Sequence, residues 1–289
     1  MSRISVIVTT YNRPGALRVC LNSLALQSDP DFEILIADDG SGESTRETIL
    51  RYTTENTRAK AVRHVYQEDR GFRAGTIRNK AVAKSRGDYL VFMDGDCVVF
   101  PDFIAMHRKL AESAYFVPGN RVLLSKKYTG EVLNKDIPLY QKSFLYFLGL
   151  FLTGKINHCA SLVRLPLGFL RRLHTTQWKK AKTCNLGMWR NDFTRVNGFD
   201  ETFEGWGYED SDLVVRLIHA GVYRKTGRHA VPVLHLWHPD NDRSREPLNL
   251  QRFLDRLQNH QPAFAERGFN RYIGAADLDD PADRAGPPF

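Results

Sequence analysis

The chain has 289 residues, of which 42% are hydrophobic and 26% are charged. These proportions exclude a fibrous or largely disordered chain and leave room for one large folded core or two ordinary ones. The formal net charge is +8, so an anionic surface or an anionic ligand is a natural partner.

The four cysteines are Cys20, Cys97, Cys159 and Cys184, and no two of them have CxxC spacing. This pattern fits buried free thiols in a reducing compartment better than a disulfide framework or a zinc site. The sequence enters a strand at residue 4, which leaves no room for a signal peptide, and no apolar run reaches the ~20 residues of a membrane-spanning helix. We therefore expect a cytoplasmic protein, or one bound peripherally to the cytoplasmic face of the inner membrane.

The first hundred residues alternate between strands and helices. Apolar runs predict strands at residues 4–9, 32–37, 61–66 and 89–94. Apolar residues at helical spacing follow the turn at residues 12–15, and further helices are predicted at about residues 44–52 and 74–85. This βαβ alternation predicts an α/β fold with a mostly parallel, Rossmann-like central sheet flanked by helices.

The strand at residues 89–94 ends in Asp94-Gly95-Asp96. Five consecutive apolar residues, 89–93, indicate a strand buried on both faces, so the two carboxylates emerge where the strand leaves the core. Hard oxygen ligands at this position suit Mg²⁺ or Mn²⁺, which can hold the phosphates of a nucleotide. An ordinary acidic turn is the alternative for this tripeptide taken alone.

Polar residues also follow two other predicted strands, at 9–11 and at 38–39. In a parallel α/β sheet, ligands bind beyond the carboxyl ends of the strands, where all three polar groups would meet. Three such groups at one sheet edge are hard to attribute to chance.

Four motifs occur in this order: residues 5–12 (SVIVTTYN), 37–41 (ADDGS), 78–79 (RN) and 87–96 (GDYLVFMDGD). Over residues 3–120 they resemble the nucleotide-sugar-binding half of the family 2 glycosyltransferases, which have the GT-A fold. The resemblance implies that Thr9, Tyr11 and Asp39 hold the uracil and ribose, and that Arg78 lies near the diphosphate. It places Asp94 and Asp96 at the ribose and the metal. The remaining positions that it assigns to the nucleotide-sugar site are Arg13 and Gly95.

A helix at residues 103–111 and a strand at 115–118 precede a basic insertion. Residues 125–183 contain eleven Lys or Arg and two acids, Glu131 and Asp136. Within the insertion, residues 144–152 form an apolar run too short to span a bilayer. The run could rest on an anionic membrane or bind a lipid-linked acceptor, or it could be a buried core helix, and the pattern alone does not separate these cases.

Residues 197–212 (NGFDETFEGWGYEDSD) combine glycines, aromatics and acids. They predict a tight loop followed by a helix at about residues 209–219. The core stripe of this helix is Leu213, Val214 and Leu217. Helical spacing predicts that Asp210 shares that face and that Asp212 points away from it. The acids could alternatively be no more than favourable residues at a helix N-terminus.

The Gly-Trp-Gly-x-Glu-Asp motif in this segment resembles the acceptor-side region of β-1,4-galactosyltransferases and chondroitin polymerases. The resemblance implies that Asp210 is the catalytic base, that Glu209 contacts the acceptor sugar and that Trp206 stacks on it. Tyr208 stands where those relatives often carry another glycine, which implies a differently shaped acceptor pocket. Since the motif also occurs in retaining relatives, an inverting reaction is inferred from the whole pattern.

Residues 231–239 (VPVLHLWHP) read as a strand that ends in two histidines. In the enzymes that the chain resembles, a histidine about 25 residues beyond the base completes the metal site, which favours His235, with His238 as the second choice. Alternation puts the two on opposite faces of a regular strand, so both can bind one ion only if the strand ends between them. An imidazole beside two carboxylates favours Mn²⁺ over Mg²⁺. Two ordinary structural histidines are the alternative.

These features divide the chain into four segments. Residues 1–120 form the nucleotide-sugar-binding half, 121–183 the basic and apolar insertion, and 184–274 the acceptor-side, catalytic half of the same GT-A domain. A last helix is predicted at 248–258, and residues 275–289 read as a disordered tail.

The sequence thus favours a metal-dependent inverting glycosyltransferase that moves a hexose or N-acetylhexosamine from a UDP-sugar to a glycan or lipid-linked glycan. Bacterial surface polysaccharide or lipopolysaccharide is the expected setting. A sugar-phosphate nucleotidyltransferase is one alternative, although the turn after the first strand lacks a glycine-rich basic loop. A nucleic-acid-binding module is the other, and it gives no role to four carboxylates in a site for phosphates: Asp39, Asp94, Asp96 and Asp210. We therefore expect no nucleic-acid partner.

Overall fold

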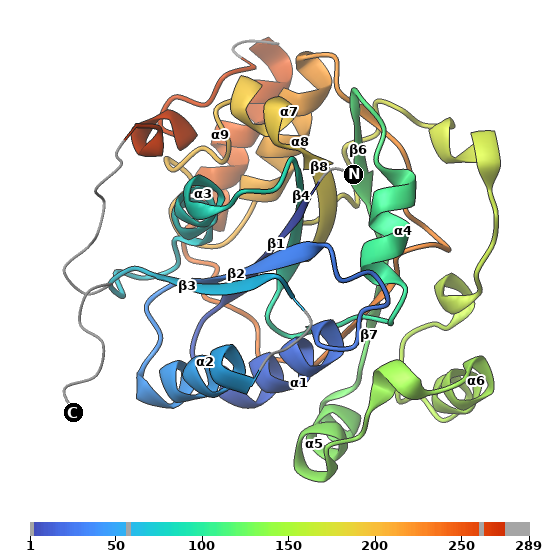
Figure 1. Cartoon of the computed structure of the whole chain (residues 1–289). Coiled ribbons are helices and arrows are strands. Elements are labelled where there is room, and N and C mark those ends of the chain that lie inside the picture. Colours follow the sequence, from blue (N-terminus) through green and yellow to red (C-terminus); the bar gives the residue numbers. More distant parts are fainter. Residues whose placement is uncertain (1–2, 56–58, 260–262, 275–289) are drawn as a thin grey trace.

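The computed structural model describes residues 3–55, 59–259 and 263–274. Its centre is a twisted seven-stranded sheet (Figure 1). From edge to edge the strands are β3 (Ala61–Tyr66), β2 (Phe32–Asp38), β1 (Ile4–Thr10), β4 (Tyr89–Asp94), β8 (Asn185–Trp189), β6 (Tyr115–Pro118) and β9 (Tyr223–Arg224). The first four strands are parallel, and β8 runs antiparallel to both of its neighbours. The predicted mostly parallel α/β sheet is confirmed.

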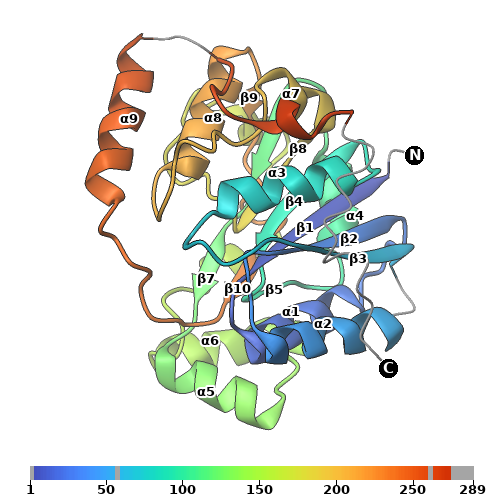
Figure 2. The ribbon, with the colours of Figure 1, turned by 90° about the vertical axis from the view of Figure 1, so that its left-hand side faces the viewer.

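Helices cover both faces of this sheet, as Figure 2 shows for α1 (Pro14–Leu24) and α2 (Glu43–Glu55) on one side and α3 (Ala74–Lys84) on the other. The alternation of side chains along β1 explains the two layers. Val6 and Val8 pack into a core with Leu17 of α1, whereas Ile7 packs into a second core with Ile77 of α3. Because both faces are covered, β4 is apolar from Tyr89 to Met93, and β1 and β2 are apolar at most positions and do not alternate with polar residues.

A second, three-stranded sheet contains β5 (Cys97–Val98), β10 (Val233–His235) and β7 (Arg121–Leu123). The predicted strand over residues 231–239 is therefore too long, since β10 ends at His235. Beyond that residue the backbone leaves the ladder, because the amide of Trp237 donates to Thr129 Oγ1. This early end changes how the two histidines can be used.

The other helices are α4 (Phe103–Leu110), α5 (Lys126–Lys135), α6 (Phe144–Leu152), α7 (Arg190–Arg195), α8 (Glu209–His219) and α9 (Glu246–Asn259). Short 3₁₀ turns lie at Leu139–Gln141, Ala160–Leu162, Gly168–Arg172 and Phe269–Tyr272. The apolar run at residues 144–152 is a helix that is buried on one side only. The predicted tail at 275–289 lies outside the described residues, and the segment boundaries stay predictions.

Helix α8 corrects one prediction about Asp212. Its side chain does not point away into solvent but is fully buried. It pairs with Arg216 on the same helix at 2.7 Å and with Arg256 of α9 at 3.0 Å, and Arg256 also pairs with Asp200 at 2.8 Å. Helical periodicity predicted the face correctly but did not reveal that α9 covers it. This buried ion network joins α8 to α9 and to the loop before α8.

His107 of α4 makes the stability of the protein depend on pH. The imidazole is fully buried, and burial lowers its pKa to about 4. In the unfolded state the histidine has its ordinary pKa near 6.5. Between pH 6.5 and pH 4 the unfolded state is therefore protonated at this residue, whereas the native state is not. Stability is retained above pH 6.5 and is lost as the pH falls from 6.5 towards 4.

We expect the free energy of unfolding to drop by about 2 kcal/mol between pH 7 and pH 5 through this one group. The measurement is urea denaturation across that pH range. A His107→Asn variant, which does not titrate there, should lose correspondingly less over the same interval. Equal pH slopes in the two proteins would remove His107 as the cause.

Candidate active site

A cavity of about 510 Å³ opens at the carboxyl ends of β1, β2 and β4, next to the N-terminus of α8. It brings together the donor-side and acceptor-side segments, which are far apart in the sequence. Every residue that the sequence assigned to a site lines it: Thr9, Tyr11, Arg13, Asp39, Arg78, Asp94, Gly95, Asp96, Trp206, Tyr208, Glu209, Asp210, His235 and His238.

Arg78 of α3 joins the two sides of the cavity. Thr9 and Asp94 are register partners on β1 and β4, and the buried guanidinium of Arg78 spans them. Its Nε donates to Thr9 Oγ1 at 3.0 Å and one terminal nitrogen donates to Asp94 Oδ1 at 3.2 Å. The other terminal nitrogen lies 3.4 Å from Glu209 Oε1 at the start of α8. One cation thus fixes the donor-side strands relative to the acceptor-side helix.

The structure separates two adjacent carboxylates at the end of β2. Asp38 is fully buried and accepts from the amide of Ser41 at 2.8 Å, and its other oxygen lies 3.0 Å from His64 Nε2. Asp39 lines the cavity, and it accepts from Gln67 and from the amide of Arg73. Burial raises the pKa of Asp39. Asp38 therefore supports the turn, and Asp39 is the carboxylate available to a ligand.

The turn after β1 supplies two more cavity residues. Tyr11 is half-exposed and donates its hydroxyl hydrogen to Asp69 at 2.7 Å. Arg13 pairs with Asp96 at 2.9 Å. An added Cβ at Gly95 would lie 3.1 Å from the carbonyl oxygen of Thr9, a tight contact, so the turn between the two carboxylates favours a residue without a side chain.

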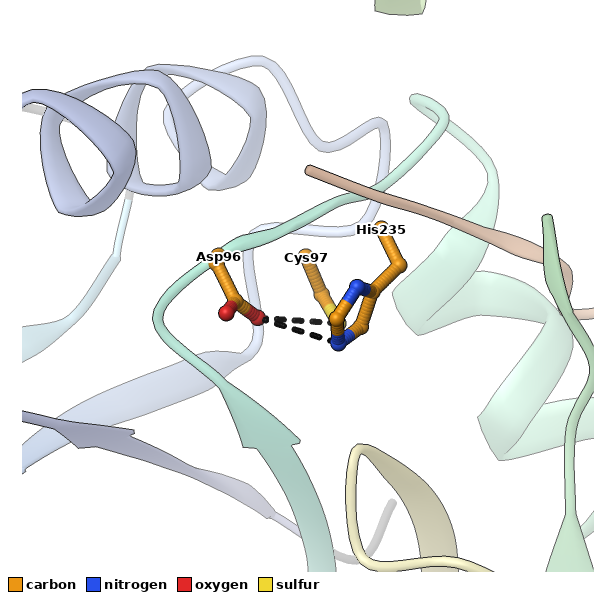
Figure 3. A group of neighbouring side chains, drawn as sticks. All are labelled: Asp96, Cys97 and His235. Carbon is orange, nitrogen blue, oxygen red and sulfur yellow. Dashed lines mark hydrogen bonds and ion pairs between the residues drawn. The ribbon is translucent and has the colours of Figure 1, made fainter. Parts of the chain in front are cut away.

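Asp96, Cys97 and His235 form a compact group of potential metal ligands (Figure 3). Strand pairing creates it, because the antiparallel register of β5 and β10 places His235 opposite Cys97. One donor atom from each residue lies within 4.8 Å of the others, and His235 Nε2 is 3.5 Å from Asp96 Oδ1. Asp94 is not a member of this group, since Arg78 holds its carboxylate instead.

The chemistry of this group fits a divalent transition metal. Contact with Cys184 and burial raise the pKa of the Cys97 thiol well above its usual range, which disfavours the thiolate form that binds metals. Burial lowers the pKa of His235, which keeps its imidazole neutral and able to coordinate. The effective donors are one carboxylate and one imidazole, a set that suits Mn²⁺ better than Mg²⁺.

The second histidine lies on the other side of the same carboxylate. His238 Nε2 is 3.5 Å from Asp96 Oδ2, and the two imidazole rings are 5.2 Å apart between centroids. This arrangement is possible because β10 ends at His235, the condition under which one ion can use both residues. Both histidines thus face Asp96, and His235, not His238, belongs to the compact group of potential ligands.

The acceptor-side loop presents Trp206 and Tyr208 to the cavity. The guanidinium of Arg243 lies 4.6 Å from the Trp206 ring centre, and Tyr208 stacks on Phe253 of α9 at 5.3 Å. Tyr208 has φ +68°, a left-handed conformation that favours glycine. A glycine would adopt this backbone conformation with less strain. In this chain the position holds a tyrosine, and its ring packs against Phe253.

Asp210 and Glu209 start α8 and face the cavity together. Asp210 lies 3.4 Å from Lys182 Nζ and accepts from the Ser211 hydroxyl at 3.2 Å. Glu209 is as buried as Asp210, and burial and then the neighbouring Asp210 charge raise the pKa of Glu209. The two carboxylates thus differ in partner, Lys182 for Asp210 and Arg78 for Glu209.

Comparison with known proteins identifies the two halves of this cavity. Residues 5–165, more than half of the chain, match the family described as glycosyl transferase family 2. The chain belongs to glycosyl transferase family 2. Residues 173–236 match a second family, described as the N-terminal domain of galactosyltransferase, which covers Trp206 to His235. Both predicted resemblances are confirmed.

Two curated relatives extend the family assignment. A validoxylamine A glucosyltransferase of Streptomyces hygroscopicus is 31% identical over 236 residues, which cover 78% of this chain and 54% of the relative. A chondroitin synthase of Escherichia coli is 27% identical over 76% of this chain and 33% of its own length. The chain thus spans about half the length of the first relative and a third of the second.

A solved structure supports the GT-A fold. A mannosyltransferase from Pyrobaculum calidifontis, in complex with GDP-Man and Mn²⁺, superimposes with a TM-score of 0.56 over 99% of this chain and 76% of its own. The sequence identity is 17%, so the likeness concerns the fold. Among the described residues of this family member, no helix is both long and apolar enough to cross a bilayer.

The sequence did not assign several other residues that line the cavity, among them Arg121, Lys182, Trp237 and Arg243. Three of these four lie in loops or short strands without a periodic pattern, and Lys182 belongs to a segment with many similar cations. Arg121 is exposed on β7 and forms no ion pair with any described residue. The only sequence signal was the excess of positive charge, which does not say which cation faces the site.

Replacing Arg78 by lysine should destabilise the protein by about 1–3 kcal/mol, because an ammonium keeps the charge but cannot reach the oxygens of Thr9, Asp94 and Glu209 at once. The matched control is Arg70→Lys, since Arg70 pairs only with exposed Glu68. Thermal and urea denaturation measure the difference. Indistinguishable stability of the two variants would show that the Arg78 bridge does not hold the two sides of the cavity together.

Proposed function

We propose that this chain is an inverting, metal-dependent glycosyltransferase that moves a hexose or N-acetylhexosamine from a UDP-sugar to a glycan or a lipid-linked glycan. One observation carries the proposal. A single cavity holds the strand-end carboxylates Asp39, Asp94 and Asp96 on one side and Asp210 at the start of α8 on the other. A donor and an acceptor that occupy the two sides would meet between them.

Asp210 is the proposed catalytic base. Its carboxylate takes the proton of an acceptor hydroxyl, whose oxygen then forms the bond to the anomeric carbon of the donor sugar. The bond from that carbon to the diphosphate breaks on the opposite face, and its electron pair leaves with UDP, so the configuration inverts. Lys182 lies close enough to stabilise the ionised carboxylate. Glu209 and Trp206 orient the acceptor, and Tyr208 shapes its pocket.

Asp96 and His235 would hold the metal ion, with Asp94 and His238 as further ligands within the cavity. When bound, such an ion supplies positive charge for the departing diphosphate. Arg78 and Arg13 already neutralise the two carboxylates in part. Arg121, whose charge acts on Asp94, lines the same space.

The donor is proposed to be a UDP-sugar because of Asp39. A carboxylate accepts a hydrogen bond from the N–H of a base such as uracil, and the ring of Tyr11 is exposed in the same cavity. Thr9 and Gly95 line the cavity beside Arg78 and would meet the ribose and diphosphate. Because the structurally similar mannosyltransferase binds GDP-Man, GDP is included among the nucleotides to be tested.

We place the enzyme in the cytoplasm, because the four cysteines are free and buried and suit a reducing compartment. Bacterial surface polysaccharide or lipopolysaccharide synthesis is the proposed setting. Membership of glycosyl transferase family 2 favours this function over the nucleotidyltransferase and nucleic-acid-binding alternatives.

The test is a thermal-shift panel of UDP, GDP, CMP and ADP, each with Mn²⁺ and with EDTA. A ligand that binds only the native state raises the melting temperature. We expect a shift with UDP that requires Mn²⁺, followed by release of UDP from UDP-sugars when an acceptor is present. A melting-temperature shift with GDP alone would mean that the donor is a GDP-sugar and not a UDP-sugar. No shift with any nucleotide, with or without Mn²⁺, would contradict the proposed site.

A further inference from the structure

Helix α6 exposes an apolar side that the active site does not use. Phe147 and Leu150 point inward and pack in a core with Tyr128. Leu145 and Leu152 are seven residues apart, hence on one side of the helix, and each is 75% exposed. A helix that is apolar on its solvent side as well as its core side indicates a binding surface.

The exposed apolar surface continues beyond α6. Among the described residues, nineteen large hydrophobic side chains are exposed, and nine of them lie within residues 144–173, so the surface is concentrated there. Figure 1 shows that α6 and the yellow-green segment after it run along one side of the molecule, outside the central sheet. The nine residues are Phe144, Leu145, Phe151, Leu152, Val163, Leu165, Phe169, Leu170 and Leu173. We call them the apolar face.

The segment that carries the apolar face contains basic residues and no acidic ones, although Lys155, Arg164 and Arg172 pair with carboxylates from other segments. Residues 137–191 contain no Asp or Glu but nine Lys or Arg, at positions 142, 155, 164, 171, 172, 179, 180, 182 and 190. Some of these cations are neutralised from elsewhere, such as Arg172 by Glu112. Lys127 on α5 and Lys180 are exposed and form no ion pair with any described residue. Exposed apolar side chains flanked by free cations are complementary to an anionic lipid surface.

We propose that the apolar face binds an anionic lipid bilayer, with Leu145, Leu152 and Phe169 inserted among the headgroups and nearby lysines facing lipid phosphates. The residues just after α6 also contact the wall of the active-site cavity. Asn157 exchanges hydrogen bonds with Leu123 of β7, and Leu123 lines the cavity. Lys126 of α5 lies over the ring of Trp237, which also lines it.

This proximity gives the surface a role in the reaction. A protein held by the apolar face keeps the cavity next to the bilayer, where a sugar acceptor attached to a lipid would be found. The delivery of a lipid-linked acceptor rests on the proposed function. The binding of lipid itself does not, because it needs neither donor nor metal.

The experiment is flotation of the full chain with two kinds of vesicle, pure phosphatidylcholine and phosphatidylcholine mixed with phosphatidylglycerol. We expect binding to the anionic vesicles that weakens at high ionic strength, and little binding to the neutral ones. The triple variant Leu145→Ser, Leu152→Ser, Phe169→Ser should lose affinity for anionic vesicles by at least about tenfold. The control Leu50→Ser removes a residue on α2 that is 55% exposed, and it should bind like the wild type.

Melting temperatures check that both variants fold, which the exposure of these residues leads us to expect. Equal vesicle binding by the triple variant and the wild type would overturn the proposal. Two other results would also do so: a wild-type dimer that the triple variant abolishes while vesicles go unbound, or binding to random RNA without binding to vesicles. If vesicles bind but UDP with Mn²⁺ gives no thermal shift, the lipid surface stands and the proposed function fails.

Discussion

Replacing Asp210 by asparagine is expected to lower kcat by about 10²–10⁴-fold, while the affinity for the nucleotide sugar stays close to that of the wild type. The asparagine keeps the size of the side chain and can still accept from the Ser211 hydroxyl, but its amide does not take up a proton at neutral pH. The lost step is proton removal from the acceptor hydroxyl. The donor lies on the other side of the cavity and keeps all of its contacts.

The measurement combines steady-state transfer with donor binding by calorimetry in the presence of Mn²⁺. Glu246→Gln is the matched control, since Glu246 also lines the cavity but begins α9 away from the strand ends. It should retain most of its activity. Full turnover by the Asp210 variant would take the base role away from this residue, and a parallel loss of donor affinity would mean that its effect is structural.

Replacing Asp96 by asparagine should weaken Mn²⁺ binding by at least about a hundredfold, because changes even in the residues that support metal ligands cost 10–100-fold. The amide keeps one oxygen donor but loses the negative charge that faces both His235 and His238. Arg13, which pairs with Asp96 at 2.9 Å, would also be left without its anion. Positive charge would then remain where the metal should bind.

Free Mn²⁺ measured by electron paramagnetic resonance during a titration with UDP reports this loss without any need for turnover. Asp240→Asn is the control, since Asp240 lines the same cavity and its only described ion pair is a long, exposed one with Arg243. His235→Ala should behave like the Asp96 variant. If the Asp96 variant bound Mn²⁺ as tightly as the wild type, Asp96 would not be a metal ligand. Asp94, the other carboxylate of the turn, would then be the candidate.

Much of the donor side could be read from the sequence. The strands β1, β2, β3 and β4 begin and end within one residue of their predicted bounds. Each is a short segment, mostly apolar in β1, β2 and β4, that is closed by polar turn residues. In a parallel sheet the chain direction alone puts all carboxyl ends at one edge. Thr9, Asp39, Asp94 and Asp96 therefore lie together in the cavity, as their positions after these strands predicted.

The structure of the acceptor side was harder to predict from the sequence. The helix that starts at Glu209 was predicted correctly, but the burial of Asp212 was not, since it depends on Arg256 from a helix more than forty residues further along the chain. The length of β10 was also wrong, because a side chain of α5 ends the strand by accepting from Trp237. Local periodicity contains no information about such distant partners.

The sequence by itself determined the order of the elements, the edge of the sheet at which the polar residues gather and the chemical types available there. Only the tertiary structure decided which of two adjacent carboxylates faces the cavity, as Asp39 does and Asp38 does not. It also decided that Arg78 bridges Thr9, Asp94 and Glu209, and that half of α6 is left exposed. The physical reason is range: helix and strand patterns arise from neighbours a few residues apart, whereas burial and ion pairing depend on segments that meet only when the chain has folded.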